Sequence, residues 1–416
     1  MKVLLINRND FVDGGADRVF LNTFDLLQVA GCGLQVEKFT REDVGMETIV
    51  DPRSLSVWKK LLHVRDYLYN RRVAGCLDRK IQVFRPDVAH VHLFYGTLST
   101  SILKVLKKKK VPVVLTVHDY RLLCPANAML DRHGHICEKC YRTKYYQCFI
   151  KRCSGGNLFF STVIMLEAYL RKWMYKPIKL IDRFIFVSDF SRNKHIEFDP
   201  RYMAKSIRLY NMADEKPGII PIKGDYLLFY GRISKEKGLL TLIEAVKNIQ
   251  VKLIIAGRGP QEEEIKRLID YKTIRPATNN PQPATRNQQP ATSTIDFAGF
   301  LSGSELGQLI LGCSFVVVPS EWYENNPMTV VEAFALGKPV IGSRIGGIPE
   351  LVTSETGFLF EPGNPLSLAE AIEKAVNLST EKYKMMSVSC REFANMNFDR
   401  RKHLEQLTGI YQQVVN

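Results

Sequence analysis

Short apolar runs alternate with helical patterns along almost the whole chain. In the first half, four runs are typical of strands buried in a parallel sheet, and the segments between them have the spacing of amphipathic helices. The expected strands are Lys2–Asn7, Val88–His92, Val111–Val117 and Phe184–Ser188. The expected helices are Ala16–Ala30, Trp58–Phe84 and Leu98–Lys107. This alternation predicts a doubly wound α/β domain.

A second series of the same kind follows. Its expected strands are Tyr226–Tyr230, Val251–Ala256, Ser314–Val318 and Pro339–Gly342. Its expected helices are Leu239–Asn248, Gln261–Ile269 and Met328–Leu336. Prolines and glycines interrupt any regular element in 211–224 and indicate a linker there. We therefore expect two Rossmann-like domains, residues 1–212 and 218–398.

A low-complexity segment interrupts the second domain. Pro-Ala-Thr recurs at 276–278, 283–285 and 290–292 in a stretch rich in Gln, Asn and Pro. Its prolines exclude a helix interior, and it has too little apolar surface to pack. It predicts a surface loop at about 272–293, for which an inert expansion is favoured over a recognition segment.

Composition and charge narrow the class of protein. With 45% hydrophobic residues in 416, the chain is not globally disordered, and no apolar run reaches the ~20 residues that span a bilayer. The apolar stretch before Asn7 and Arg8 is too short for a secretory signal, so we expect a cytoplasmic protein. The net charge of +15 divides into +16 for residues 1–210 and −1 for the rest. The first half thus favours an anionic partner, which could be nucleic acid, a lipid surface or a phosphorylated substrate, over simple solubility.

Two carboxylates separated by seven residues stand at an expected strand-to-helix junction. Glu324 precedes the helix and Glu332 lies inside it, while Pro327 suits the first helical turn. The N–H groups of the next three residues would then be free donors at a positive helix end, which suits a diphosphate. These residues are Met328, Thr329 and Val330.

Cations and glycines follow other expected strands of the second domain. Arg232 and Lys237 lie in the loop after Tyr226–Tyr230, at the end of the strand where open α/β sheets bind ligands, and two cations there fit a pyrophosphate. Gly257-Arg258-Gly259-Pro260 and Ala298-Gly299-Phe300 end two further strands and extend this rim.

The first domain has candidate residues in equivalent places. Gly14 and Gly15 link its first strand to its first helix and allow a close approach of the backbone to a phosphate or sugar. His118 and Asp119 end another strand, and we expect the histidine to face an interdomain cleft.

As a set, these motifs resemble the family 4 retaining glycosyltransferases of the GT-B fold. The motifs that carry the resemblance are Asp13–Ala16, His118-Asp119, Val187–Ser191, Gly231–Gly238, Pro319–Glu332 and Gly346–Glu350. The resemblance covers nearly the whole chain outside the Pro-Ala-Thr segment. It implies an N-terminal acceptor domain, a C-terminal donor domain and a last helix, residues 399–416, that crosses back onto the first domain.

The resemblance also implies residue roles. Catalytic positions would be Glu324, Arg232, Lys237 and His118. Donor-binding positions would be Gly14, Gly15, Arg232, Lys237, Gly299, Phe300, Asn326, Pro327, Met328, Thr329 and Glu332. The two cations would hold the diphosphate of a UDP- or GDP-linked sugar, Glu332 the ribose and Glu324 the sugar ring, with no catalytic metal. The acceptor would be a glycan or a lipid-linked sugar in cell-surface polysaccharide or glycolipid synthesis.

A cysteine cluster lies in an insert at about 121–156. Cys137, Cys140, Cys148 and Cys153 have the short spacings of a structural zinc site, with Cys124, His133 or His135 as alternative ligands. Free buried thiols and disulfides are the competing interpretations. A similar insert occurs in some bacterial members of the family.

Two basic segments with aromatic residues could meet an anionic membrane, Trp58–Tyr69 and Tyr169–Leu180. The alternative is that their aromatic side chains pack on the domain itself. Two other functions compete with glycosyl transfer. A GT-B-like nucleotide-sugar epimerase would keep the nucleotide pocket without an acceptor channel. A zinc-stabilised, basic nucleic-acid-binding protein would leave the two glutamates unexplained, so we expect no nucleic-acid partner.

Overall fold

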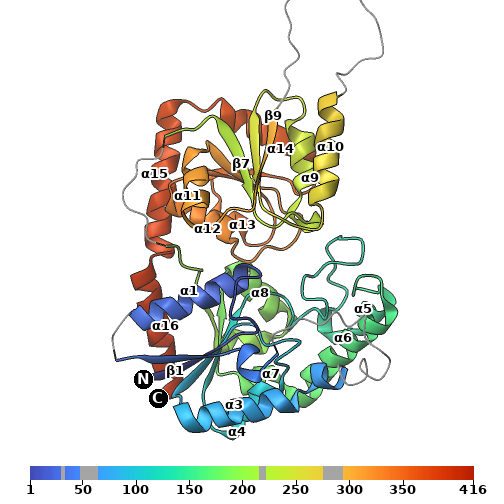
Figure 1. Ribbon diagram of the computed structural model, residues 1–416, viewed down its shortest axis with the longest axis vertical. Coiled ribbons are helices and arrows are strands. Elements are labelled where there is room, and N and C mark those ends of the chain that lie inside the picture. Colours follow the sequence, from blue (N-terminus) through green and yellow to red (C-terminus); the bar gives the residue numbers. More distant parts are fainter. Residues whose placement is uncertain (30–32, 47–63, 215–221, 275–293) are drawn as a thin grey trace, which may run out of the picture. The chain divides into compact units, whose positions relative to one another are not determined.

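The computed structural model describes residues 1–29, 33–46, 64–214, 222–274 and 294–416. These residues form two compact units, one of Met1–Met212 with Arg400–Asn416 and one of Ala213–Asp399. Each unit contains a six-stranded parallel sheet flanked by helices (Figure 1). The α/β class predicted from the alternating pattern is therefore confirmed.

The N-terminal sheet has the order β2-β1-β3-β4-β5-β6. Its strands are β1 (Lys2–Ile6), β2 (Gln35–Phe39), β3 (Val88–Val91), β4 (Val113–Val117), β5 (Arg183–Phe186) and β6 (Ser206–Arg208). Its α-helices are α1 (Gly15–Val29), α3 (Arg71–Phe84), α4 (Ser101–Lys108), α5 (Tyr146–Ile150), α6 (Leu158–Leu170), α7 (Pro177–Leu180), α8 (Asp189–Phe198) and α16 (Arg400–Val415). A π-helical turn, η4 (Arg171–Tyr175), extends α6, and 3-10 turns occur at Glu42–Val44, Tyr141–Thr143 and Pro200–Lys205.

The C-terminal sheet has the order β12-β11-β10-β7-β8-β9. Its strands are β7 (Tyr226–Tyr230), β8 (Lys252–Ala256), β9 (Thr294–Gly299), β10 (Phe315–Val318), β11 (Val340–Ser343) and β12 (Gly357–Phe360). Its helices are α9 (Leu239–Val246), α10 (Glu262–Ile274), α11 (Gly303–Gly312), α12 (Met328–Ala335), α13 (Ile348–Leu351), α14 (Pro365–Val376) and α15 (Thr380–Asn397), with a 3-10 turn η6 at Lys235–Lys237.

Each sheet reverses its strand order once. In the C-terminal sheet the chain runs from β7 outward to β9 and then resumes at β10, on the other side of β7. In the N-terminal sheet the reversal falls between β1 and β3. At such a reversal the loops that follow the neighbouring strands lead to opposite sides of the sheet, and α/β proteins bind ligands at this point of the carboxyl edge.

One predicted helix is interrupted. Within Trp58–Phe84, residues 58–63 lie outside the described part, residues 64–68 are helical, and the chain leaves the helix at Tyr69 and Asn70. The Asn70 side chain accepts the N–H of Val73 and caps the start of α3. The predicted single helix is therefore divided into two at Tyr69 and Asn70. The predicted Pro-Ala-Thr loop also lies largely outside the described residues. No helix of the described residues is long and apolar enough to cross a membrane.

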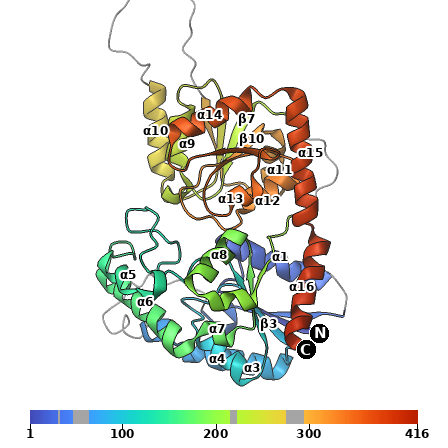
Figure 2. The same cartoon turned by 180° about the vertical axis from the view of Figure 1, so that it is seen from behind.

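The last helix completes the core of the N-terminal unit, as the resemblance implied. Leu407, Ile410 and Tyr411 of α16 are buried against Val3 and Val114 of the sheet. The Tyr411 hydroxyl lies 2.6 Å from Nδ1 of His90, a buried residue of β3. Figures 1 and 2 show α16 alongside α1 in this unit.

We expect Tyr411→Phe to destabilise the N-terminal unit by about 1–3 kcal/mol, because it leaves a buried imidazole nitrogen without its partner. Chemical denaturation would measure this loss. Tyr146→Phe, at a side chain that is 45% exposed, serves as the control and is expected to change stability by less than about 0.5 kcal/mol. Equal stability of Tyr411→Phe and the parent protein would show that this contact does not hold the helix.

Candidate active site

An ion pair between a half-buried lysine and a buried carboxylate lies where the strand order of the C-terminal sheet reverses. Nζ of Lys237, in the segment after β7, lies 2.5 Å from Oε1 of Glu324, in the segment after β10. The Ser320 hydroxyl donates to the same carboxylate oxygen at 2.7 Å. Burial raises the pKa of Glu324, but the charge of Lys237 and these hydrogen bonds outweigh it, so the pKa is lowered overall. The carboxylate is therefore ionised at neutral pH, next to a fixed cation.

Two glycines allow these segments to pack closely. Gly238 has φ +66°, and a Cβ there would lie 1.9 Å from the carbonyl oxygen of Pro319. Gly346 has φ +61°, and a Cβ there would lie 2.3 Å from the carbonyl oxygen of Glu324. The N–H of Gly347 donates to the same Glu324 oxygen at 2.7 Å. The glycines of the predicted motifs thus hold the backbone on both sides of the ion pair.

The start of α12 differs from the prediction in one respect. Pro327 is the N-cap in an extended conformation, one residue before the first helical turn. Its carbonyl accepts the N–H of Val330 at 2.9 Å, so Val330 is not the free donor that was expected. Within the described part of the chain, the N–H groups of Met328 and Thr329 have no backbone acceptor, as expected for the first turn of a helix. Asn326 is buried beside them, and Glu332 is half-buried on the second turn.

The predicted rim brings three strand ends together. Gly257 donates its N–H to the carbonyl of Gly299 at 2.7 Å, and Gly231 donates to Ala256 at 3.0 Å. The guanidinium of Arg258 lies 5.5 Å from the centre of the exposed Phe300 ring. Arg232 is exposed at the end of β7. The structure therefore places Gly299, Phe300, Arg232 and Lys237 at the same carboxyl edge.

The N-terminal unit presents Gly14 and Gly15 at its own reversal point. Both are exposed, and no atom lies within 4 Å of where a Cβ would be. Buried Asp17 accepts the side-chain N–H of Asn7 at 2.9 Å and the backbone N–H of Asp13 at 3.3 Å, which fixes this loop. The sequence interpretation missed Asn7 and Asp17, although a polar residue directly after an apolar strand was a usable signal.

A row of three histidines crosses the same edge. Nδ1 of His92 lies 2.9 Å from Nε2 of His118, and the His90 and His92 rings are 4.5 Å apart. Burial lowers the pKa of His118 to about 4 and that of His90 to about 3, with the neighbouring histidines lowering His90 further. These rings are therefore neutral at physiological pH, and His118 acts as a neutral hydrogen-bonding group. His90 and His92, visible as two polar residues in an apolar strand, were missed as its partners.

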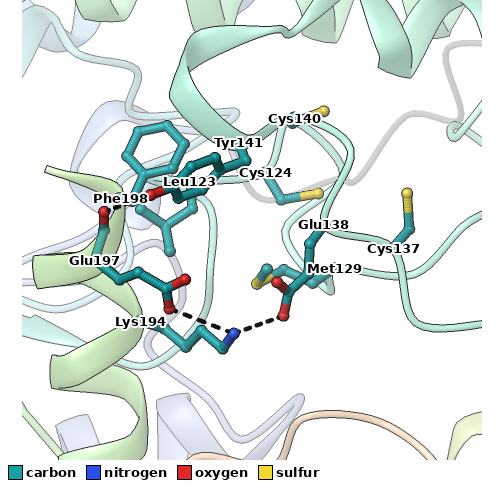
Figure 3. A pocket seen from close by; sticks show the side chains of 10 residues that line it. All are labelled: Leu123, Cys124, Met129, Cys137, Glu138, Cys140, Tyr141, Lys194, Glu197 and Phe198. Carbon is teal, nitrogen blue, oxygen red and sulfur yellow. Dashed lines mark hydrogen bonds and ion pairs between the residues drawn. The ribbon is translucent and has the colours of Figure 1, made fainter.

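The predicted zinc site is not formed. In the described part of the chain, no three His, Cys, Asp or Glu side chains are close enough together to hold a metal ion. Cys124, Cys137 and Cys140 line a small pocket beside α8 without converging on one point (Figure 3). Cys148 and Cys153 are free thiols that form a hydrogen bond with each other, in an apolar cluster with Tyr145 and Ala168.

The surroundings of the cysteines explain this outcome. Burial raises the pKa of Cys124 to about 11 and also raises that of Cys140, which opposes the thiolate form that zinc requires. The alternative ligands are no better placed, since His133 accepts from Arg132 at 2.8 Å and the side chain of His135 is 79% exposed. What holds the insert to α8 is an ion pair, Glu138 with Lys194 at 2.8 Å (Figure 3).

Comparison with known proteins identifies the family. Residues 14–214 match the profile described as Glycosyltransferase Family 4, and residues 213–392 match that of Glycosyl transferases group 1. The chain belongs to the family 4 glycosyltransferases. The two matches meet at the boundary between the two units, so each unit of this family 4 chain corresponds to one profile.

Individual relatives agree with this assignment. An uncharacterised glycosyltransferase of Methanocaldococcus jannaschii is 30% identical over 56% of this chain and 60% of its own length. Two further curated relatives align with this chain over only 34% and 35% of their own lengths. Bacillus subtilis TuaC, provisionally assigned as a teichuronic acid biosynthesis glycosyltransferase, is 26% identical over 83% of this chain and 76% of its own.

Solved structures share the fold. The crystal structure of Anabaena HepE in complex with UDP and glucose covers 99% of this chain and 100% of its own, with a TM-score of 0.64 at 18% identity. The fold of this family 4 chain is therefore GT-B.

We expect the N-terminal unit to lose stability on mild acidification. The pKa values of His118, His195 and His403 are lowered to about 4 by burial, from about 6.5 in an unfolded chain. The unfolded chain therefore binds protons that the folded unit does not, so stability is fully present above about pH 6.5 and is lost towards pH 4. Each histidine contributes a loss of about 2 kcal/mol at pH 5. Asp119 acts in the opposite direction. Burial raises its pKa to about 6, so acidification stabilises the folded unit at this one residue, against the loss at three histidines.

The C-terminal unit supplies an internal control, because residues 213–399 contain no histidine. Urea unfolding followed by tryptophan fluorescence in Trp322→Phe reports only on residues 1–212, which hold Trp58 and Trp173. The double variant Trp58→Phe/Trp173→Phe reports on the C-terminal unit. An equal loss in both units between pH 7 and 5 would contradict this account.

Proposed function

We propose that this protein is a retaining glycosyltransferase that moves a sugar from a nucleotide-diphosphate sugar to a glycan or lipid-linked acceptor in the synthesis of cell-surface polysaccharide or glycolipid. The observation that carries the proposal is the ion pair of half-buried Lys237 with buried Glu324 at the reversal point of the C-terminal sheet. It stands directly before the N-terminus of α12, where the N–H groups of Met328 and Thr329 have no backbone acceptor.

The charged and polar groups at this carboxyl edge fit a sugar diphosphate. Lys237, Arg232 and the N–H groups of Met328 and Thr329 offer positive charge and donors to diphosphate oxygens. The ionised Glu324 offers an acceptor to sugar hydroxyls, and Glu332 offers one to the ribose. Since cations and a helix end neutralise the diphosphate, this donor site has no need of a metal ion. UDP is the favoured nucleotide, because the HepE structure of the same fold holds UDP and glucose.

Retention requires that the acceptor attacks the face of the sugar from which the diphosphate departs. The bond between the anomeric carbon and the diphosphate oxygen breaks while the acceptor oxygen bonds to the same face of the sugar. The acceptor proton passes to the departing phosphate oxygen, so no side chain has to act as a base. Lys237 and Arg232 stabilise the negative charge that grows on the leaving group.

The N-terminal unit is proposed to receive the acceptor. Gly14 and Gly15 leave space for a close approach to its backbone, and neutral His118 is suited to a hydroxyl of the transferred sugar. The excess of positive charge in residues 1–210 favours an anionic membrane surface or a phosphate-linked acceptor near this unit. The provisional assignment of TuaC to teichuronic acid biosynthesis supports a role in polysaccharide synthesis.

A panel of UDP-, GDP- and ADP-sugars tests the proposal directly. We expect one nucleotide class, UDP by preference, to raise the melting temperature and to be hydrolysed slowly in the absence of an acceptor. The free nucleoside diphosphates serve as controls for the contribution of the sugar. Protein that responds to none of the nucleotides would overturn the transferase assignment.

Variants at the ion pair test the roles of its two members. Glu324→Gln is nearly isosteric, and Lys237→Ala removes a diphosphate cation. We expect each to lower kcat at least 100-fold, which corresponds to about 2.7 kcal/mol of transition-state stabilisation. Lys237→Ala also leaves Glu324 buried and unpaired, so Lys237→Ala/Glu324→Gln checks that the loss does not come from unfolding.

The matched control is Lys252→Ala. Lys252 forms an exposed pair with Asp296 at 3.5 Å and starts β8, at the opposite edge of the same sheet. It is expected to retain parental activity. Full activity in Glu324→Gln or in Lys237→Ala would contradict the roles proposed for them.

A further inference from the structure

Helix α6 is apolar on all sides and buries its single charged residue. Its inner face carries Glu167, which is 6% exposed and pairs with Arg171 at 3.0 Å and with Arg121 at 3.8 Å. Its outer face carries Phe159 and Leu166, each 46% exposed. These two are seven residues apart and therefore lie on the same side of the helix. A helix this apolar is normally buried, so an apolar outer face indicates a partner.

The neighbouring elements extend this face. The π-helical turn after α6 exposes Trp173 at 62% and Met174 at 60%. Helix α5, which packs beside α6 through Tyr145 and Tyr169, exposes Ile150 at 61%. Of the 25 large apolar side chains exposed in the described residues, ten lie between residues 136 and 174. We call the surface formed by Ile150, Phe159, Leu166, Trp173 and Met174 the outer face.

The stretch of chain that carries the outer face is strongly basic. Residues 139–181 contain nine Lys and Arg but a single carboxylate, Glu167, which is buried. Lys144, Arg152, Lys176 and Lys179 are exposed among them. A second copy of this chain would bring like charges together, which disfavours self-association through this face. Three of the five side chains of the outer face, Ile150, Leu166 and Met174, have no ring to stack on bases, which disfavours nucleic acid.

We propose that the outer face docks onto an anionic phospholipid surface. Its apolar side chains enter the boundary between headgroups and acyl chains, and the surrounding cations contact lipid phosphates. Figures 1 and 2 show α5 and α6 on the side of the N-terminal unit opposite α16, so α16 does not cover these two helices. The docking extends the proposed function, since it would hold the acceptor unit at the surface that bears a lipid-linked acceptor.

Vesicle flotation of the full chain, without donor or acceptor, tests the docking separately from transfer. We expect binding to vesicles of phosphatidylcholine with phosphatidylglycerol, weak binding to phosphatidylcholine alone, and weakening by salt. Phe159→Asp/Leu166→Asp is expected to reduce the partition coefficient at least tenfold. Lys144→Glu/Lys179→Glu is expected to abolish the preference for phosphatidylglycerol.

The chain offers a closely matched control. Phe159 and Leu366 are both the second residue of a helix that is capped by an asparagine, and Leu366 is 77% exposed in the other unit. An aspartate suits the first turn of either helix, so Phe159→Asp and Leu366→Asp are both expected to fold, which thermal melting checks. Leu366→Asp should bind vesicles like the parent protein.

Three results would overturn the proposal: no binding to any vesicle, equal binding by Phe159→Asp/Leu166→Asp and the parent, or self-association in sedimentation that the double variant abolishes while vesicles stay unbound. A loss of flotation with nucleotide-sugar hydrolysis intact would support docking whatever the acceptor. Flotation without any response to nucleotide sugars would keep the docking and remove the transferase assignment.

Discussion

The reversal of strand order in each sheet is the constraint on which the candidate site depends. β7 and β10 are hydrogen-bonded neighbours, yet the chain reaches β10 only after building β8 and β9 on the other side of β7. The segments that follow these two strands are therefore free to diverge and to face one another across the carboxyl edge. Lys237 and Glu324 meet there, held by glycines that permit backbone contact where any side chain would collide.

Electrostatics differ in kind between the two units. The C-terminal unit is nearly neutral overall and relies on a few placed groups, such as a cation whose partner carboxylate is buried beside it. The N-terminal unit carries the surplus positive charge on its surface, while the polar groups at its reversal point are neutral histidines and amides. The placed charged groups of the C-terminal unit are suited to neutralising the charge of a diphosphate. The neutral histidines and amides of the N-terminal unit are suited to binding hydroxyl groups, and its basic surface is suited to an anionic partner.

The sequence predicted the central strands of both sheets and gave no range for β2, β6, β9 and β12, although it placed the end of a strand at Ala298–Phe300, where β9 ends. These four are the edges of the two sheets. Central strands are buried on both faces and therefore appear as continuous apolar runs. An edge strand such as β2, with the half-buried residues Glu37 and Lys38, has no such run. Whether a strand could be predicted therefore depended on how far it is buried by neighbouring strands. A local sequence pattern does not show this for an edge strand.

The candidate site shows the same division. Motif spacing placed Lys237 and Glu324 on adjacent loops, whereas the conformation of Pro327 and the partners of His118 depended on contacts between distant segments. The cysteine spacings suggested a metal site, but the apolar packing around Tyr145 separated the thiols. Similarly, the basic and aromatic composition of 169–180 suggested a membrane segment, but only the fold showed that α6 buries Glu167 and exposes Phe159 and Leu166.

The position of α16 has a consequence for how the chain folds during synthesis. Residues 213–399 form a complete unit and can fold as soon as they leave the ribosome, since domains generally fold as units. The unit that starts the chain lacks Leu407, Ile410 and Tyr411 until the last helix has been made. The N-terminal unit is therefore completed only after the C-terminal unit has been made. Until then the sheet residues Val3 and Val114 lack the cover that α16 gives them.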